Sequence, residues 1–173
     1  QVAPQMFNGF YDGTTYYLFG SDLKYQYGAV FTSTDAVTWT EQPYVSYLVA
    51  QSSRYLNGKY FRIGNEGMQV CSDGKSWAFQ WGGTFSDIVY DGSKYIAAGC
   101  RGSDGNIWTS PDLSTWSRAV MPASFVRTLN AVAYGNGKYV AAGINTPDKN
   151  ALLTSADGIT WTKPSLGLHE VNG

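Results

Sequence analysis

The chain has 173 residues, a formal net charge of −1, a charged fraction of 14% and an aromatic fraction of 16%. The nearly balanced charge argues against nucleic acid as a partner, since binding to its phosphates needs a basic face. No apolar run approaches the roughly 20 residues that cross a membrane. A single histidine argues against a His/Cys zinc site, and we expect neither a metal nor a cofactor.

The first element in chain order is a hairpin centred on Asp12-Gly13, between Tyr11 and Tyr16. Two tyrosines around a turn return three more times, at residues 55–60, 90–95 and 134–139. Asp-Gly and Asn-Gly pairs accept the positive φ of the primed turns that join antiparallel strands. Each copy is therefore predicted to join a strand A to a strand B through a primed turn.

The second element of each repeat is a turn with an Asp and, four positions later, a Trp, at residues 32–39, 70–77, 109–116 and 154–161. A Ser, or Cys71 in the second copy, precedes the Asp by two positions. We expect each carboxylate to accept hydrogen bonds from the N–H groups of its own turn, and each Trp to pack between neighbouring units. Metal ligation or paired acid chemistry is the alternative, but one Asp per repeat places these carboxylates too far apart to cooperate. The residues concerned are Asp35, Asp73, Asp112 and Asp157, with Trp39, Trp77, Trp116 and Trp161.

The repeat period predicts the fold class. The first tyrosines stand at residues 11, 55, 90 and 134, so the steps are 44, 35 and 44 residues, close to one propeller blade. No segment has helical apolar periodicity. We predict an all-β propeller in a single domain over 1–173, built from four four-stranded antiparallel blades, with a fifth repeat starting at 171–173. The blades are expected at about 6–43, 48–81, 84–120 and 128–164. Small residues such as Ala97 and Ala141 predict that strand B lies nearest the axis.

The connections that differ between the repeats are those from strand B to strand C and from strand D to the next strand A. The topology places them on the face opposite the two kinds of turn, and variable loops on a rigid scaffold commonly carry function. Aromatic and charged residues that interrupt the repeat pattern there are predicted to bind a ligand, although they could instead fill gaps beneath loops or against a neighbouring blade. They are Tyr25, Tyr27, Tyr44, Trp81 and Arg101.

The four Asp/Trp copies resemble the Asp-box, or bacterial neuraminidase repeat, of sialidase-like and photosystem II assembly-factor-like propellers. The resemblance implies a propeller in which the Asp turns are structural and remote from an active site. The sialidase motif has one more residue between Asp and Trp than the copies here. Residues 61–64 are similar to the Phe-Arg-Ile-Pro stretch whose Arg binds the substrate carboxylate in sialidases. However, they also fill the ordinary strand B position and lack the proline, so Arg62 is expected to be a strand residue.

These patterns lead to a functional prediction. We expect a non-catalytic extracellular module, at a cell or virion surface, that recognises glycans or a protein partner. A structural component of a fibre, filament or larger propeller is one alternative, and a sialidase-like glycoside hydrolase is another. The apolar ends of the blade row are expected to be covered by self-association or by further propeller repeats. A disulfide between Cys71 and Cys100 and a pair of free thiols are both open at this stage.

Overall fold

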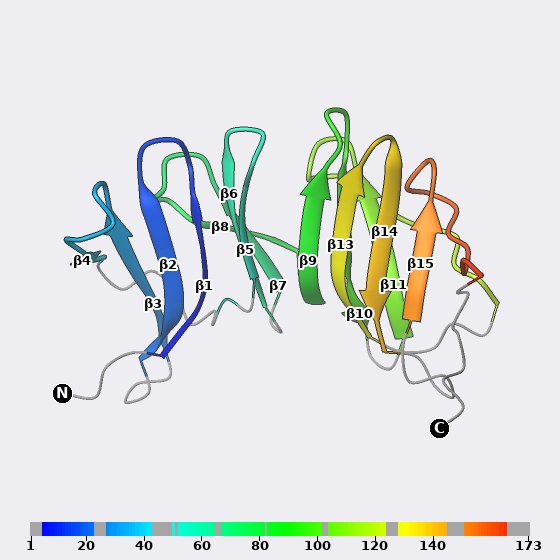
Figure 1. Cartoon of the computed structure of the whole chain (residues 1–173), viewed down its shortest axis with the longest axis horizontal. Coiled ribbons are helices and arrows are strands. Elements are labelled where there is room, and N and C mark those ends of the chain that lie inside the picture. Colours follow the sequence, from blue (N-terminus) through cyan, green and yellow to red (C-terminus); the bar gives the residue numbers. More distant parts are fainter. Residues whose placement is uncertain are drawn as a thin grey trace, which may run out of the picture.

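The computed structural model describes residues 5–22, 27–42, 50, 52–64, 67–81, 83–101, 104–123, 128–144 and 151–165. Within these ranges the regular structure consists of β-strands, which form antiparallel sheets in sequence order. No helix in this part of the chain is long and apolar enough to cross a membrane. The prediction of an all-β propeller is confirmed (Figure 1).

Each sheet is one blade, and each blade is one sequence repeat. Blade 1 contains β1 (Gln5–Tyr11), β2 (Tyr16–Asp22), β3 (Tyr27–Ser33) and β4 (Thr40–Glu41). Blade 2 contains β5 (Ser52–Leu56), β6 (Lys59–Gly64), β7 (Gly67–Cys71) and β8 (Ala78–Trp81). Blade 3 contains β9 (Thr84–Tyr90), β10 (Tyr95–Arg101), β11 (Asp104–Ser110) and β12 (Ser117–Arg118). Blade 4 contains β13 (Leu129–Gly135), β14 (Lys138–Gly143) and β15 (Ala151–Ser155).

The last blade differs from the prediction of four full strands. Its fourth strand, expected near residues 160–163, is reduced to one bridge between Thr154 and Thr162. Two backbone hydrogen bonds of 2.9 Å, one in each direction, join these residues. The outermost strands β4 and β12 are also only two residues long, so pairing weakens toward the rim in every blade but the second.

The axis is lined by the first strand of each blade. β1 contacts β5, β5 contacts β9, and β9 contacts β13. The prediction that strand B lies nearest the axis is therefore wrong. Ala97 and Ala141 are fully buried because they lie on sheet faces that are covered by the adjacent blade. Figure 1 shows blade 1 and blade 4 at opposite ends of the long dimension, with blades 2 and 3 between them.

Among the residues that the structure describes, the hydrophobic core forms three clusters, one at each junction between consecutive blades. Blades 1 and 2 enclose Phe19, Val30 and Ala50, with Trp77 packed against them. Blades 2 and 3 enclose a cluster that includes Phe61, Ile88 and Ala97, with Trp116 at its edge. Blades 3 and 4 enclose a cluster that includes Ile96, Leu129 and Trp161. The prediction that the repeated tryptophans pack between units is confirmed for these three; Trp39 lies instead on the outer side of blade 1.

A glycine recurs near the end of the second strand of blades 1, 3 and 4 for a steric reason. A Cβ at Gly20, Gly99 or Gly143 would overlap a backbone carbonyl oxygen at the start of the first strand of the same blade, or in Thr128 just before it. The pairing register of the two strands shifts at this point in all three blades. The close approach of the two backbones leaves room only for hydrogen.

Cys71 is a free, buried thiol, so the structure contains no disulfide between Cys71 and Cys100. Its Sγ donates a hydrogen bond of 2.9 Å to Asp73, as the serine hydroxyls do in the other three Asp turns. Burial, followed by this bond to the carboxylate, raises the pKa of the thiol. Cys71 thus behaves as a hydroxyl substitute and not as a reactive nucleophile.

Candidate functional site at the propeller axis

The four Asp turns are built as the sequence predicts. In each turn one carboxylate oxygen accepts hydrogen bonds of 2.7–2.8 Å from the N–H groups two and three positions later. These bonds lower the pKa of all four carboxyls below the ordinary value, to about 2 in Asp157, where the Thr160 and Ile159 N–H groups are the main cause. In Asp73 the hydrogen bond from the Cys71 thiol is the first cause of the lowered pKa, followed by the two N–H groups. The predicted hydrogen bonds between each carboxylate and the N–H groups of its own turn are therefore confirmed.

The turn between the first two strands takes two forms, so the prediction of primed turns in all copies is half right. Asn57-Gly58 and Asn136-Gly137 have positive φ at both residues, as a type I′ turn requires. Asp12 and Asp91 instead accept hydrogen bonds from backbone N–H groups two and three positions later, and only the following glycine has positive φ.

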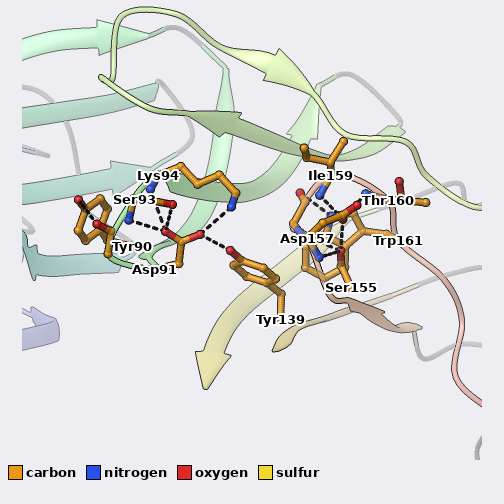
Figure 2. A network of polar contacts seen from close by, with 12 residues as sticks. Tyr90, Asp91, Ser93, Lys94, Tyr139, Ser155, Asp157, Ile159, Thr160 and Trp161 are labelled. Carbon is orange, nitrogen blue, oxygen red and sulfur yellow. Dashed lines mark hydrogen bonds and ion pairs between the residues drawn. The ribbon is translucent and has the colours of Figure 1, made fainter. Parts of the chain in front are cut away.

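The Asp or Asn of this turn also connects its blade to the next one through a side-chain hydrogen bond. Tyr60 donates a hydrogen bond of 2.7 Å to Asp12, and Asn57 donates one of 3.1 Å to the Tyr95 hydroxyl. Tyr139 donates to Asp91, which also pairs with Lys94 at 2.8 Å (Figure 2). Burial opposes ionisation of Asp12, but the bonds from Tyr60, Thr15 and Thr14 together lower its pKa to about 2. Each junction thus has one Tyr–Asp or Tyr–Asn bond at its turn end.

A buried carboxylate, Asp87, lies on the first strand of blade 3 at the axis. Its Oδ1 lies 2.8 Å from the Arg54 guanidinium of blade 2 and accepts a 2.9 Å bond from the Ile88 N–H. Its Oδ2 accepts a 3.2 Å bond from the Val132 N–H of blade 4. Asp87 therefore joins three blades, and its negative charge is balanced by Arg54.

The polar row continues on the first strands of blades 1 and 2. The Ser53 hydroxyl donates to the Asn8 side-chain oxygen, and the Asn8 amide donates 3.0 Å to the Ala50 carbonyl. Arg54 donates 3.0 Å to the Ser53 carbonyl through its other terminal nitrogen. The Arg54 side chain keeps 42% of its surface exposed, whereas that of Asp87 keeps 5%. Arg54 is thus the charged group of this row that solvent or a ligand can reach.

The predicted ligand residues remain predictions. Tyr25 and Tyr44 lie outside the described residues, and Tyr27, Trp81 and Arg101 are described only in their backbone. Tyr27 begins β3, whereas Trp81 and Arg101 end β8 and β10, so all three backbones lie at the end opposite the turns.

Sequence reasoning missed Asp87. The available signal was a carboxylate in the middle of a mainly apolar strand, Phe85-Ser86-Asp87-Ile88-Val89. A charge at such a position is rarely buried unless it is paired.

Arg62 is a packing residue, as its strand B position predicts. It is 1% exposed, and its guanidinium lies 4.2 Å from the centre of the Trp77 ring. It also donates a 2.7 Å hydrogen bond to Gln69. Within the described ranges, no group of three or more His, Cys, Asp or Glu residues is arranged to hold a metal ion.

The chain matches solved structures of glycoside hydrolases. A Bombyx mori GH32 beta-fructofuranosidase is 12% identical, with a TM-score of 0.55 over 91% of this chain and 48% of the enzyme. A family 117 glycoside hydrolase from Zobellia galactanivorans is 12% identical, with a TM-score of 0.53 over 92% and 68%. A glycosyl hydrolase from Bacteroides ovatus is 12% identical, with a TM-score of 0.53 over 93% and 70%. The chain thus spans about half of the length of the Bombyx mori enzyme.

No protein-family model matches the chain, and no curated protein sequence matches it significantly. The comparisons place the chain among propeller-like folds, and the narrower Asp-box family is not confirmed. They contradict the prediction of a non-catalytic, non-enzymatic module, because the matching structures are glycoside hydrolases. At 12% identity this likeness shows the fold. Activity is therefore a matter for proposal.

Proposed function

We propose that the chain is a glycoside hydrolase of the propeller class, with its carbohydrate site at the axis. The observation that carries this proposal is Arg54, an exposed cation held at the axis by the buried Asp87. Support also comes from the three solved structures of similar fold described above, each of which is named as a glycoside hydrolase or a GH-family enzyme. The Asp-box assignment and an extracellular or surface location belong to the same proposal.

Arg54 is suited to bind a sugar because its guanidinium is fixed in orientation. One terminal nitrogen is bonded to Asp87 and the other to the Ser53 carbonyl, at 2.8 and 3.0 Å. A guanidinium has five N–H donors, so these two contacts leave others for the hydroxyl or carboxylate oxygens of a substrate. Fixing a donor before binding lowers the entropic cost of using it.

Asp87 is a positioning residue in this scheme. Hydrolysis by retention or inversion needs two carboxyl groups beside the scissile bond, and Asp87 is too deeply buried to be one of them. The reacting pair therefore lies, in this proposal, at the end of the sheets opposite the Asp turns. The backbone places Asp22 at the end of β2 and Asp104 at the start of β11, both at that end.

The proposal is tested by incubating the purified chain with a panel of methylumbelliferyl glycosides and by measuring reducing ends released from polysaccharides. We expect turnover of at least one substrate. Arg54→Ala should lower kcat/KM by roughly tenfold or more through KM, because it removes a binding group. Arg118→Ala, on the exposed outer strand β12, is the matched control and should leave kcat/KM unchanged.

Asp22→Asn and Asp104→Asn should each lower kcat with little change in KM if these residues carry the chemistry. A folded chain that turns over no member of the panel would overturn the proposal. So would hydrolysis that is unaffected by Arg54→Ala, because the site would then lie elsewhere.

A further inference from the structure

In the part of the chain that the structure describes, the two end blades each leave one sheet face uncovered. On blade 4 this face contains Ala133 and Val140, which are paired in register, with Ala142 beside them. Val140 is 38% exposed, whereas Ile96, the residue in the same position of blade 3, is fully buried. Blade 4 itself covers Ile96, as part of the cluster between blades 3 and 4. We call the surface formed by Ala133, Val140 and Ala142 the blade 4 outer face.

The opposite face of blade 1 is uncovered in a complementary way. It has an apolar hollow of about 220 Å³ lined by Met6, Leu18, Phe31 and Trp39. The residues at the same four positions of blade 4 are fully or almost fully buried against blade 3; they are Leu129, Ala141, Leu153 and Trp161. We call the surface formed by Met6, Leu18, Phe31 and Trp39 the blade 1 outer face. It corresponds to the surface with which blade 4 covers blade 3.

The two kinds of residue that form the polar bond of each junction also occur one at each end of the row of blades. Tyr16 stands where Tyr60, Tyr95 and Tyr139 stand in the later blades, and Asn136 stands where Asp12, Asn57 and Asp91 stand in the earlier blades. Neither Tyr16 nor Asn136 makes a side-chain hydrogen bond within the described ranges. Tyr16 is 37% exposed, whereas Tyr139 is 2% exposed.

We propose that the blade 4 outer face binds the blade 1 outer face of a second copy of this chain. Tyr16 of one copy then bonds to Asn136 of the other, and the apolar hollow on the blade 1 outer face is filled. The occupant is a second copy because one chain carries both halves of a junction that it already forms three times internally. The described residues of both faces are uncharged, so identical copies do not repel one another. Such a head-to-tail contact closes a ring or continues as a chain of copies.

The first test is sedimentation equilibrium of the intact chain, with a mass of 18.9 kDa, over the micromolar range. We expect a concentration-dependent mass of at least twice this value. Val140→Glu places a charge on the blade 4 outer face, and Met6→Glu places one on the blade 1 outer face. Each variant alone should remain a monomer, because each lacks one half of the junction.

Mixing the two variants separates a head-to-tail contact from other modes of association. The intact blade 1 face of Val140→Glu and the intact blade 4 face of Met6→Glu should together form a one-to-one dimer. Phe79→Glu is the matched control, since Phe79 is an exposed apolar residue on β8 of an internal blade. It should associate like the unmodified chain, and circular dichroism should show that every variant is folded.

The bond itself is tested by Tyr16→Phe, which we expect to weaken association by roughly three- to tenfold. Tyr11→Phe is its control, because the Tyr11 hydroxyl is bonded locally to the Gly13 carbonyl at 2.8 Å. The proposal is overturned by a monomer at every concentration, which would assign the two faces to a blade from another polypeptide. It is also overturned if either single glutamate variant still associates or if the mixture yields no dimer.

Discussion

At the residue scale, the Asp turns show how one side chain can organise a tight reversal of the chain. The Asp157 carboxylate accepts bonds from the Ile159 and Thr160 N–H groups and from the Ser155 hydroxyl. The Trp161 indole closes the turn by donating 3.1 Å to the Gly158 carbonyl. The turn therefore places the tryptophan against the preceding blade, so a local hydrogen-bond pattern supports a long-range contact.

We predict that Asp157→Ala lowers Tm by several degrees, because two backbone N–H groups lose their acceptor. Asp157→Asn keeps a carbonyl oxygen in the same place and should lose less. Both are measured by thermal unfolding followed by circular dichroism, together with a glycoside turnover assay. Loss of turnover without loss of Tm would contradict the structural role of this turn.

The residue after the Asp in these turns offers a second prediction. It has positive φ in every copy, yet it is alanine in the first, with φ 59° at Ala36. Ala36→Gly should raise stability by about 0.5–1 kcal/mol, since glycine adopts this conformation without steric cost. Ala156→Gly, at a position of the fourth turn without positive φ, should lower stability instead. Urea unfolding of the two variants measures both signs, and a loss in Ala36→Gly would contradict the assignment of strain.

At the element scale, the junction between two blades combines an apolar cluster with one polar bond at its turn end. Tyr139 illustrates the combination, since its ring lies 6.2 Å from the Trp161 ring while its hydroxyl donates to Asp91. Burial, then the bond to Asp91, raises the pKa of Tyr139. The bond fixes how far one blade slides along the next, which apolar packing alone does not specify.

We predict that Tyr139→Phe destabilises the fold by about 1–2 kcal/mol, because Asp91 loses a buried donor. Tyr134→Phe is a matched control, since Tyr134 is 40% exposed and its hydroxyl forms no hydrogen bond in the described part of the chain. Denaturant midpoints of the two variants give the comparison. Equal midpoints would show that the hydroxyl of Tyr139 contributes nothing to the junction.

The sequence predicted the elements well because their signals are local. The Asp of each turn finds its donors within three positions, and the Asn-Gly pairs form their turns alone. Strand lengths at the rim were overestimated, since the two-residue strand β12 depends on pairing that weakens away from the axis. The order of strands from the axis was also mispredicted, because small residues suit a tight sheet-to-sheet contact as well as a crowded axis.

At the scale of the whole molecule, the axial site could not be predicted from a repeat pattern. Asp87 meets the Val132 N–H across 45 positions, and it meets Arg54 from another blade. These contacts depend on the relative placement of three blades, which the junction clusters determine together. Comparison of repeats emphasises what the blades share, whereas Asp87 and Arg54 each occur in one repeat only. The predicted ligand residues of the loops likewise occur in one repeat each.

The pH dependence of the whole fold is the last prediction. Hydrogen bonds hold the pKa of six aspartates below the ordinary 3.8, and the value is about 2 in Asp12 and in Asp157. A carboxyl with a lowered folded-state pKa contributes stability that is fully present above its unfolded pKa and is lost as pH falls through the folded value. Stability should therefore be nearly constant from neutral pH down to about 5 and should decline steeply between about 4 and 2.

The tyrosines of the junctions determine how stability changes at alkaline pH. Burial and the bonds to Asp12 and Asp91 raise the pKa of Tyr60 and Tyr139, so their contribution is present below pH 10 and is lost as pH rises above it. Tm measured by circular dichroism across the full range should thus fall at both ends. The loss of stability at acid pH arises mainly from short hydrogen bonds. This acid limb of the Tm profile should therefore persist in about 0.5 M salt, which screens only separated charges. Asp157→Asn removes one titrating group and should make the acid limb shallower; an unchanged slope, or a Tm that stays constant down to pH 2, would contradict the assignment of acid stability to these turns.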